Sequence, residues 1–226
     1  MKQTYALYHI KDKSKTKNNI YIIADHETKK AAVIDPATGF DEINELVKRF
    51  DLTLDAILIT HVHRDHIGSV GDLIKRHNCN VYVSEKEASY YKYHCKNMHL
   101  FEDQELIHLG DTAIKCLLTP GHTAGSTCFL LKNTLFSGDT IFMEGCGICT
   151  SDGASAVDMF HSIEKIKRQV ADSVLVYSGH TLGLGAEPGQ SIAYLKKHNI
   201  YFNIDDEEFF VDFRMRKGQE NLYDFR

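Results

Sequence analysis

The chain has 226 residues, 43% of them hydrophobic and 25% charged, which is typical of one globular domain covering residues 1–226. Its net charge of −5 argues against a general nucleic-acid-binding protein, because phosphate backbones attract basic surfaces. No apolar run approaches the roughly 18 residues of a membrane span, and no apolar signal region follows Met1. We therefore expect a cytoplasmic protein with no membrane partner.

The first part of the chain predicts three strands and a helix. Residues 5–10 and 20–24 predict the two strands of a hairpin, and residues 31–34 predict a third strand. The basic segment at residues 11–19 is interpreted as a solvated hairpin tip, with a binding role as the alternative. Residues 41–50 then predict an amphipathic helix with its apolar side chains on one face.

A histidine-rich motif occupies residues 60–66 and reads Thr-His-Val-His-Arg-Asp-His. It follows residues 56–59, an apolar and partly β-branched run that predicts a buried strand. It precedes residues 67–76, whose apolar side chains recur with helical spacing. The motif therefore lies at the carboxyl end of a strand, which is where open α/β sheets place their sites.

The spacing within this motif is suited to metal binding. Side chains two apart in an extended segment point the same way, so His61 and His63 can reach one metal ion. Asp65 and His66 come where the chain turns and can face a second ion. The alternative is a polar turn that is rich in histidine by chance, and three His and one Asp within six residues disfavour it.

Three later segments share one arrangement, in which an apolar run is followed by a turn of small residues and one ligand-type side chain. Pro-Gly-His-Thr carries His122, Ser-Gly-Asp-Thr carries Asp139, and Ser-Gly-His-Thr carries His180. Glycine beside the ligand lets the backbone pass close to a metal ion. Together with the first motif, these segments predict a metal-binding constellation.

The remaining segments predict further strands and helices. Residues 81–83 predict a strand, and Ser84 followed by Glu87 forms a capping-box pattern that predicts the start of a helix. Residues 88–99 are rich in Tyr and His and fit either a lid over the site or the end of that helix. Strands are expected between residues 114 and 136 and at 174–176, and helices at 158–169 and 189–198.

The order of the four motifs resembles that of the metallo-β-lactamase superfamily and, within it, of the glyoxalase II hydrolases, over about residues 20–180. The resemblance implies an α/β fold, an αββα sandwich of two mixed sheets flanked by helices, with a two-metal site at one edge. It implies that one ion is held by His61, His63 and His122. The other ion would be held by Asp65, His66 and His180, with Asp139 bridging the two.

The expected cofactors are two divalent metal ions, most simply Zn²⁺, although Fe and Mn accept the same ligand types. Two such ions lower the pKa of a shared water molecule from about 15.7 to about 7. Asp65 would orient this water as the nucleophile in addition to binding metal, which makes it the expected catalytic residue. A thioester suits this chemistry because its thiolate leaves without a strong general acid. We therefore expect a metal-dependent hydrolase acting on thioester bonds.

Substrate-binding residues are expected at Ile148, Arg214 and Lys217. In several glyoxalase II relatives, a Gly-Cys-Gly turn is followed by a basic residue that contacts glutathione. Here Ile148 follows the turn, whereas Arg214 and Lys217 match the Arg-x-x-Lys signature of that group. Half of the expected glutathione site is therefore missing. For the two basic residues, a solvated tail is the alternative.

The segment at residues 145–156 resembles the zinc-dependent hydrolases of trans-acyltransferase (bacillaene-type) polyketide pathways. This resemblance implies that the substrate is a stalled acyl group on an acyl carrier protein, which the enzyme removes in a proofreading step.

Two other enzymes and one non-catalytic role remain as alternatives. A glyoxalase II would hydrolyse S-lactoylglutathione. A persulfide dioxygenase would use the same fold with one iron ion, held by two His and one Asp. A non-catalytic protein that uses the fold only to bind a ligand would not need all seven metal-ligand positions intact. The complete second set, Asp65, His66 and His180, favours a hydrolase over a dioxygenase.

The six cysteines are scattered without the dense spacing of a disulfide framework, and we interpret them as reduced thiols. Cys146 and Cys149 form an isolated Cys-x-x-Cys motif. A redox role and a zinc role both stay open for this pair, although no second such motif completes a tetrahedral zinc site.

Overall fold

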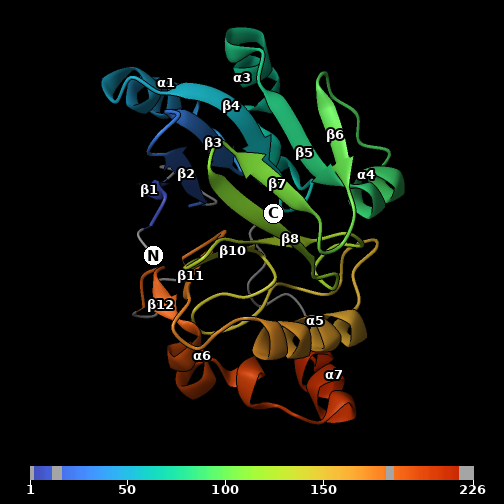
Figure 1. The fold of residues 1–226 in the computed structure, drawn as a ribbon. Coiled ribbons are helices and arrows are strands. Elements are labelled where there is room, and N and C mark those ends of the chain that lie inside the picture. Colours follow the sequence, from blue (N-terminus) through green and yellow to red (C-terminus); the bar gives the residue numbers. More distant parts are fainter. Residues whose placement is uncertain (1–2, 12–16, 182–185, 219–226) are drawn as a thin grey trace.

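The computed structural model describes residues 3–11, 17–181 and 186–218, which form two six-stranded sheets packed face to face between layers of helices (Figure 1). The predicted αββα sandwich of two mixed sheets is confirmed. Residues 12–16 of the predicted basic hairpin tip lie outside the described residues. No helix within the described ranges is long and apolar enough to cross a membrane.

The first sheet is built from the amino-terminal strands in chain order. These are β1 (Tyr5–Lys11), β2 (Asn19–Asp25), β3 (Lys30–Ile34), β4 (Thr53–Leu58), β5 (Asn80–Ser84) and β6 (Met98–Phe101). The pairs from β1 to β3 are antiparallel and those from β3 to β6 are parallel. Four helices accompany this sheet: α1 (Phe40–Arg49), α2 (Arg64–Ile67), α3 (Val70–His77) and α4 (Glu85–Tyr91).

The second sheet contains the later strands in the order β12-β11-β10-β9-β8-β7. They are β7 (Leu106–Leu109), β8 (Thr112–Leu118), β9 (Thr127–Leu130), β10 (Thr134–Gly138), β11 (Leu175–Ser178) and β12 (Gln190–Ser191). Only the β10–β11 pair is parallel among these described strands. Its outer layer comprises α5 (Ala156–Gln169), α6 (Ile192–His198), the 3₁₀ helix η1 (Ile200–Asn203) and α7 (Glu207–Met215), seen below the sheets in Figure 1.

The core has three layers because the central strands are apolar on both faces, as expected for parallel strands covered by helices. In β4, Ala56 and Leu58 face the second sheet and pack with residues such as Phe129. Ile57 alternates with them and faces the helix layer that includes Ile43 of α1. A third cluster joins the second sheet to α5, α6 and α7. The two sheets are therefore held to each other and each to its own helices.

The predicted start of the helix at residues 67–76 is wrong, because the chain forms two short helices in this region. The first ends at Ile67 and the second begins at Val70. Between them, the Ser69 hydroxyl donates to the Ala37 carbonyl at 2.9 Å, and the space beside Gly68 is filled by the same carbonyl. Contact with this neighbouring loop interrupts the helical periodicity.

Of the two interpretations of residues 88–99, the end of the helix holds for residues 88–91, and the rest of the segment leaves the helix. The helix α4 ends at Tyr91, where Lys92 takes the left-handed conformation with a φ of 52°. The chain then forms β6, which pairs with β5 as the edge of the first sheet. Similarly, the helix predicted at 189–198 begins only at Ile192, because residues 190–191 pair with β11.

All six cysteines lie in the described ranges as free thiols. Cys146 and Cys149 are buried, and burial raises the pKa of the Cys149 thiol to about 12. Burial likewise raises the pKa of Cys146 well above its usual range. Both side chains pack in the buried cluster that joins the second sheet to its helices.

Asn199 anchors the carboxyl-terminal layer to the loop that follows β10. Its fully buried amide donates to the carbonyls of Phe142 and Gly145, each at 2.9 Å. Its Oδ1 accepts from the backbone N–H of Tyr201 and Phe202 at 2.9 and 3.3 Å. This one side chain therefore fixes two segments that are more than fifty residues apart.

We expect Asn199→Ala to lower the free energy of unfolding by roughly 2–5 kcal/mol, because its hydrogen bonds contribute about 0.5–1.5 kcal/mol each. Chemical denaturation monitored by circular dichroism measures this change. The control is Asn203→Ala, which removes a single bond from an exposed side chain to the Asn199 carbonyl. Equal stability of the two variants would contradict the anchoring role.

Candidate metal centre

The seven predicted ligands lie in loops that follow the carboxyl ends of strands from both sheets. His61 and His63 follow β4, and Asp65 and His66 lie in α2 directly afterwards. From the second sheet, His122 lies between β8 and β9, Asp139 directly follows β10, and His180 follows β11. Stacking of the two sheets brings these loops together at one edge.

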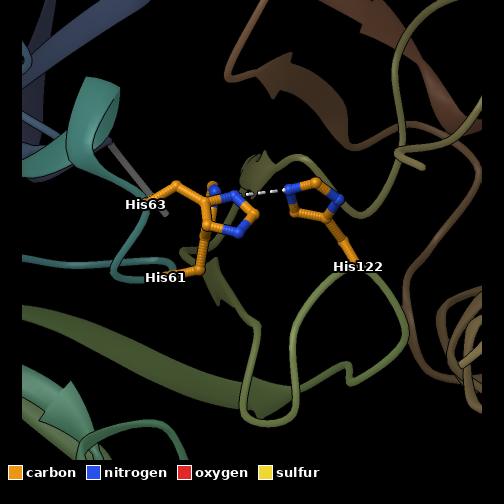
Figure 2. A group of neighbouring side chains, drawn as sticks. All are labelled: His61, His63 and His122. Atoms are coloured by element: carbon orange, nitrogen blue, oxygen red, sulfur yellow. Dashed lines mark hydrogen bonds between the residues drawn. The ribbon is translucent and has the colours of Figure 1, made fainter. Parts of the chain in front are cut away.

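The first group consists of His61, His63 and His122, whose ring nitrogens lie within 4.8 Å of one another. Figure 2 shows these three rings close together, two from the loop after β4 and one from the opposite loop. His63 Nδ1 and His122 Nε2 are 3.0 Å apart. Three imidazoles converging in this way are a common ligand set for zinc.

The second group consists of Asp65, His66 and His180, whose ligand atoms also lie within 4.8 Å of one another. His66 Nε2 and His180 Nε2 are 3.3 Å apart, and Asp65 Oδ2 lies 3.4 Å from His180 Nε2. His66 and His180 are buried, whereas His63 of the first group and Asp65 are partly exposed. The centre is therefore accessible on the side of His63 and Asp65.

Asp139 lies between the two groups. Its Oδ1 is 3.6 Å from His66 Nε2, and its Oδ2 is 3.6 Å from His122 Nε2 and 3.4 Å from His180 Nε2. One carboxylate thus faces ligands of both groups, which is the geometry that a bridging ligand needs.

The donor atoms at this centre fit metal ions. His61 Nε2 and Asp139 Oδ1 are buried polar atoms without a hydrogen-bond partner. Burying such atoms unpaired is costly, and coordination to a metal ion compensates that cost. Imidazole and carboxylate are also the ligand types that divalent first-row metals accept.

The outward-facing atoms of the ligands are held by hydrogen bonds that fix ring orientation. Buried Asp35 accepts from His66 Nδ1 at 3.0 Å and from the Thr60 hydroxyl at 2.6 Å. His122 Nδ1 donates to the Ile148 carbonyl at 2.9 Å. Such contacts leave the opposite nitrogen, Nε2, free to face the centre. Asp35 also lies near His61, but its oxygens are engaged in this support.

Glycines permit the close approach of these loops. A side chain at Gly179 would collide with Asp139 Oδ1, and one at Gly147 would collide with the Asp139 carbonyl and approach His122 Nδ1 to 2.8 Å. Gly179, which precedes His180, agrees with the expectation that glycine beside a ligand makes room at the centre. Gly121 and Gly138 make room for Met159 and Thr60 instead, and Gly147 was not predicted.

Sequence reasoning missed the contributions of Asn18 and Asp35. The Asn18 amide donates to Asp65 Oδ2 at 3.2 Å, and its Oδ1 is buried without a hydrogen-bond partner. Asn18 lies in the segment interpreted as a solvated tip, and Asp35 directly follows the strand predicted at residues 31–34. No local pattern marks either residue, because each acts on a ligand that is distant in the chain.

The three predicted substrate-binding residues occupy different environments. Ile148 and Arg214 are fully buried, whereas Lys217 is exposed beyond the end of α7. Arg214 Nε donates to the Gly147 carbonyl at 3.0 Å, and its guanidinium lies 5.9 Å from the Tyr201 ring centroid. The interpretation of Arg214 as part of a solvated tail is wrong, because this residue supports the turn preceding Ile148 from inside.

Residues 15–180 match the family described as the metallo-beta-lactamase superfamily. The chain belongs to this superfamily. It is 44% identical over 227 aligned residues to the "probable polyketide biosynthesis zinc-dependent hydrolase PksB" of Bacillus subtilis (strain 168), with 100% of both chains covered. It is 31% identical to the cytoplasmic hydroxyacylglutathione hydrolase of Saccharomyces cerevisiae, over 72% of this chain and 63% of the yeast enzyme.

A crystal structure from the same superfamily is closely similar. It is a metallo-beta-lactamase from Staphylococcus aureus subsp. aureus COL, with a TM-score of 0.87 and 30% identity. The match covers 95% of this chain and 68% of that one. The family assignment made from the motifs is thus confirmed, including the resemblance to hydrolases of polyketide biosynthesis.

The two ligand groups differ in their proton affinity. Burial lowers the pKa of His61 well below its usual range, and burial together with His122 lowers that of His63 to about 4. In the second group, burial opposes the charge of His180, but Asp139 and Asp65 outweigh it and raise its pKa to about 9. At His66, burial is likewise outweighed by Asp139 and Asp35, which raise its pKa well above its usual range. The first group therefore favours neutral rings at pH 7, whereas both histidines of the second group favour the protonated form.

We expect the two groups to bind Zn²⁺ with different pH dependence. Protons must leave both His180 and His66 before their nitrogens can bind a metal, so affinity of the second group should fall at least tenfold for each pH unit below about 9. The first group should change little between about pH 6 and about pH 8, because its histidines are already neutral. Zinc titrations of metal-free protein, followed by ¹⁵N-imidazole NMR, distinguish the groups. Parallel pH dependence of both would contradict this assignment.

We expect Asp139→Asn to weaken zinc binding at both groups, because the amide lacks the charge and the second acceptor oxygen that a bridge requires. Elemental analysis after dialysis against a weak chelator measures the loss, and circular dichroism checks the fold. A variant that retains the wild-type metal content would refute the bridging role.

Proposed function

We propose that this protein is a binuclear metal-dependent thioesterase that hydrolyses acyl groups carried on an acyl carrier protein in polyketide biosynthesis. The single observation that carries the hydrolytic part is the convergence of two ligand groups on either side of Asp139. Full-length similarity to a zinc-dependent hydrolase of polyketide biosynthesis supports the substrate class.

Under this proposal, the first ion is held by His61, His63 and His122, and the second by Asp65, His66 and His180. Bound there, the ions would lower the pKa of a water molecule and polarise the thioester carbonyl. Asp65 is partly exposed and lies 3.4 Å from His180, so it can orient that water toward the open side. Asn18 holds Asp65 in place through its amide.

The metal is proposed to be zinc in both groups. The three rings of the first group present neutral nitrogens to the centre. The second group adds two imidazoles and a carboxylate, and zinc accepts both ligand types. Elemental analysis of protein purified without chelator should approach two zinc ions per chain. About one iron ion, with oxygen-dependent turnover, would instead support a persulfide dioxygenase.

The turn at residues 145–148 favours a pantetheine-linked acyl carrier over glutathione as the group that holds the substrate. No basic side chain follows Gly147, because Ile148 takes that position and is buried. The carboxylates of glutathione would therefore lose a charge-assisted contact, whereas a pantetheine arm presents amides and methyl groups. The partial similarity to hydroxyacylglutathione hydrolase supports glyoxalase II activity as the second candidate.

We predict a higher kcat/KM on acyl groups carried by pantetheine or a carrier protein than on S-lactoylglutathione. A lost charge-assisted hydrogen bond costs about 1.5–3 kcal/mol, which corresponds to about one to two decades in specificity. Steady-state kinetics on a panel of thioesters measures the ratio. A clear preference for the glutathione thioester would refute the proposed substrate and favour glyoxalase II.

Substitution of the exposed Lys217 tests whether the enzyme recognises the carrier protein itself. Lys217→Glu should reduce kcat/KM more on an acyl carrier protein substrate than on a short acyl-N-acetylcysteamine, because only the former presents an acidic surface. Lys48→Glu is the matched control, since it reverses an exposed charge on α1. Arg214 is unsuitable for this test because it is buried. An equal loss of kcat/KM on both substrates would show that Lys217 does not contact the carrier protein.

A further inference from the structure

Glu87 is a fully buried carboxylate that belongs to neither ligand group. The sequence marks it only as the fourth residue of a capping box at the start of α4. The first half of that box is present, since Ser84 Oγ accepts from the Glu87 N–H at 3.1 Å. The Glu87 carboxylate, however, is turned toward two loops that carry metal ligands.

Both oxygens of Glu87 accept hydrogen bonds from these loops. Oε1 accepts from the Val62 N–H at 2.9 Å, and Val62 lies between His61 and His63. Oε2 accepts from the Thr123 hydroxyl at 2.9 Å and from the Gly125 N–H at 2.8 Å. Thr123 directly follows His122. One side chain therefore links the loop after β4 in the first sheet to the loop after β8 in the second.

The start of α4 packs against the second loop without intervening space. A side chain at Gly125 would collide with the Glu87 backbone nitrogen. Ser84 Oγ also donates to the Gly125 carbonyl at 2.7 Å. The loop is thus fixed on both sides of Gly125, and its position follows that of α4.

We propose that Glu87 is a positioning residue for the group formed by His61, His63 and His122, and that it acts by fixing the separation of the two loops that carry them. Hydrogen bonds to a carboxylate are about twice as strong as neutral ones. The three donors also offset the cost of burying the charge. The inference rests on the metal centre of the proposed function but not on its substrate.

The test is Glu87→Gln, which keeps the size of the side chain but removes the charge and replaces one acceptor by an NH₂ group facing N–H and O–H donors. We expect zinc affinity of the three-histidine group to fall by about 10–100-fold, as is typical when support of a ligand is lost. Affinity of the group formed by Asp65, His66 and His180 should change by less than about two-fold. Chelator competition with ¹⁵N-imidazole NMR measures each group separately.

Two control variants test whether a loss of zinc affinity comes from lower stability of the fold or from the loss of a negative charge, and not from the lost position of the ligands. Val47→Ala in α1 removes buried apolar volume far from the ligands and gives a destabilised reference. Glu85→Gln removes an exposed charge from the same helix. Neither should weaken zinc binding at the three-histidine group.

If Glu87→Gln does not fold, Thr123→Val removes one of the three donors while keeping the carboxylate, and a smaller selective loss is expected. Unchanged affinity, or an equal loss at both groups, would overturn the inference. If the wild-type protein itself fails to bind zinc, the proposed function fails instead.

Discussion

The structure depends on the burial of several imidazole and carboxylate groups at the joint edge of two apolar sheets. Five of the seven ligand side chains are no more than 5% exposed, so their polar atoms have little access to water. Burial of this kind is tolerated only where each atom has a partner. The outward-facing nitrogens of His61, His66 and His122 are paired with the Thr60 hydroxyl, Asp35 and the Ile148 carbonyl, respectively. The inward-facing atoms converge on a common centre.

The centre is also a joint between the two halves of the chain. The first sheet supplies His61, His63, Asp65 and His66, and the second supplies His122, Asp139 and His180. Neither sheet holds a complete ligand set for the first group on its own. The cluster between the sheets, which includes Leu58 and Phe136, therefore determines the ligand geometry as well as the stability of the fold.

The clustering of the seven predicted ligands could be foreseen from the sequence because each one comes shortly after an apolar strand. Their supports could not, because Asp35 lies 31 residues from His66 and Asn18 lies 47 residues from Asp65. Likewise, the Arg-x-x-Lys signature predicts a substrate-binding role for Arg214 but does not predict its burial, since two residues carry no information on which face of α7 is covered. The break at Gly68 and Ser69 was missed for the same reason, because contact with Ala37 outweighs helical periodicity.

The link from Arg214 to Gly147 has a consequence for the order of events during synthesis. The ribosome completes all seven ligands once residue 180 has been made, yet Asn199 and Arg214, which hold the loop beside His122, emerge later. Until they dock, the Ile148 carbonyl that orients His122 has no support from the carboxyl-terminal layer. A nascent chain therefore contains all seven predicted ligands before it contains the residues that support the loop beside His122.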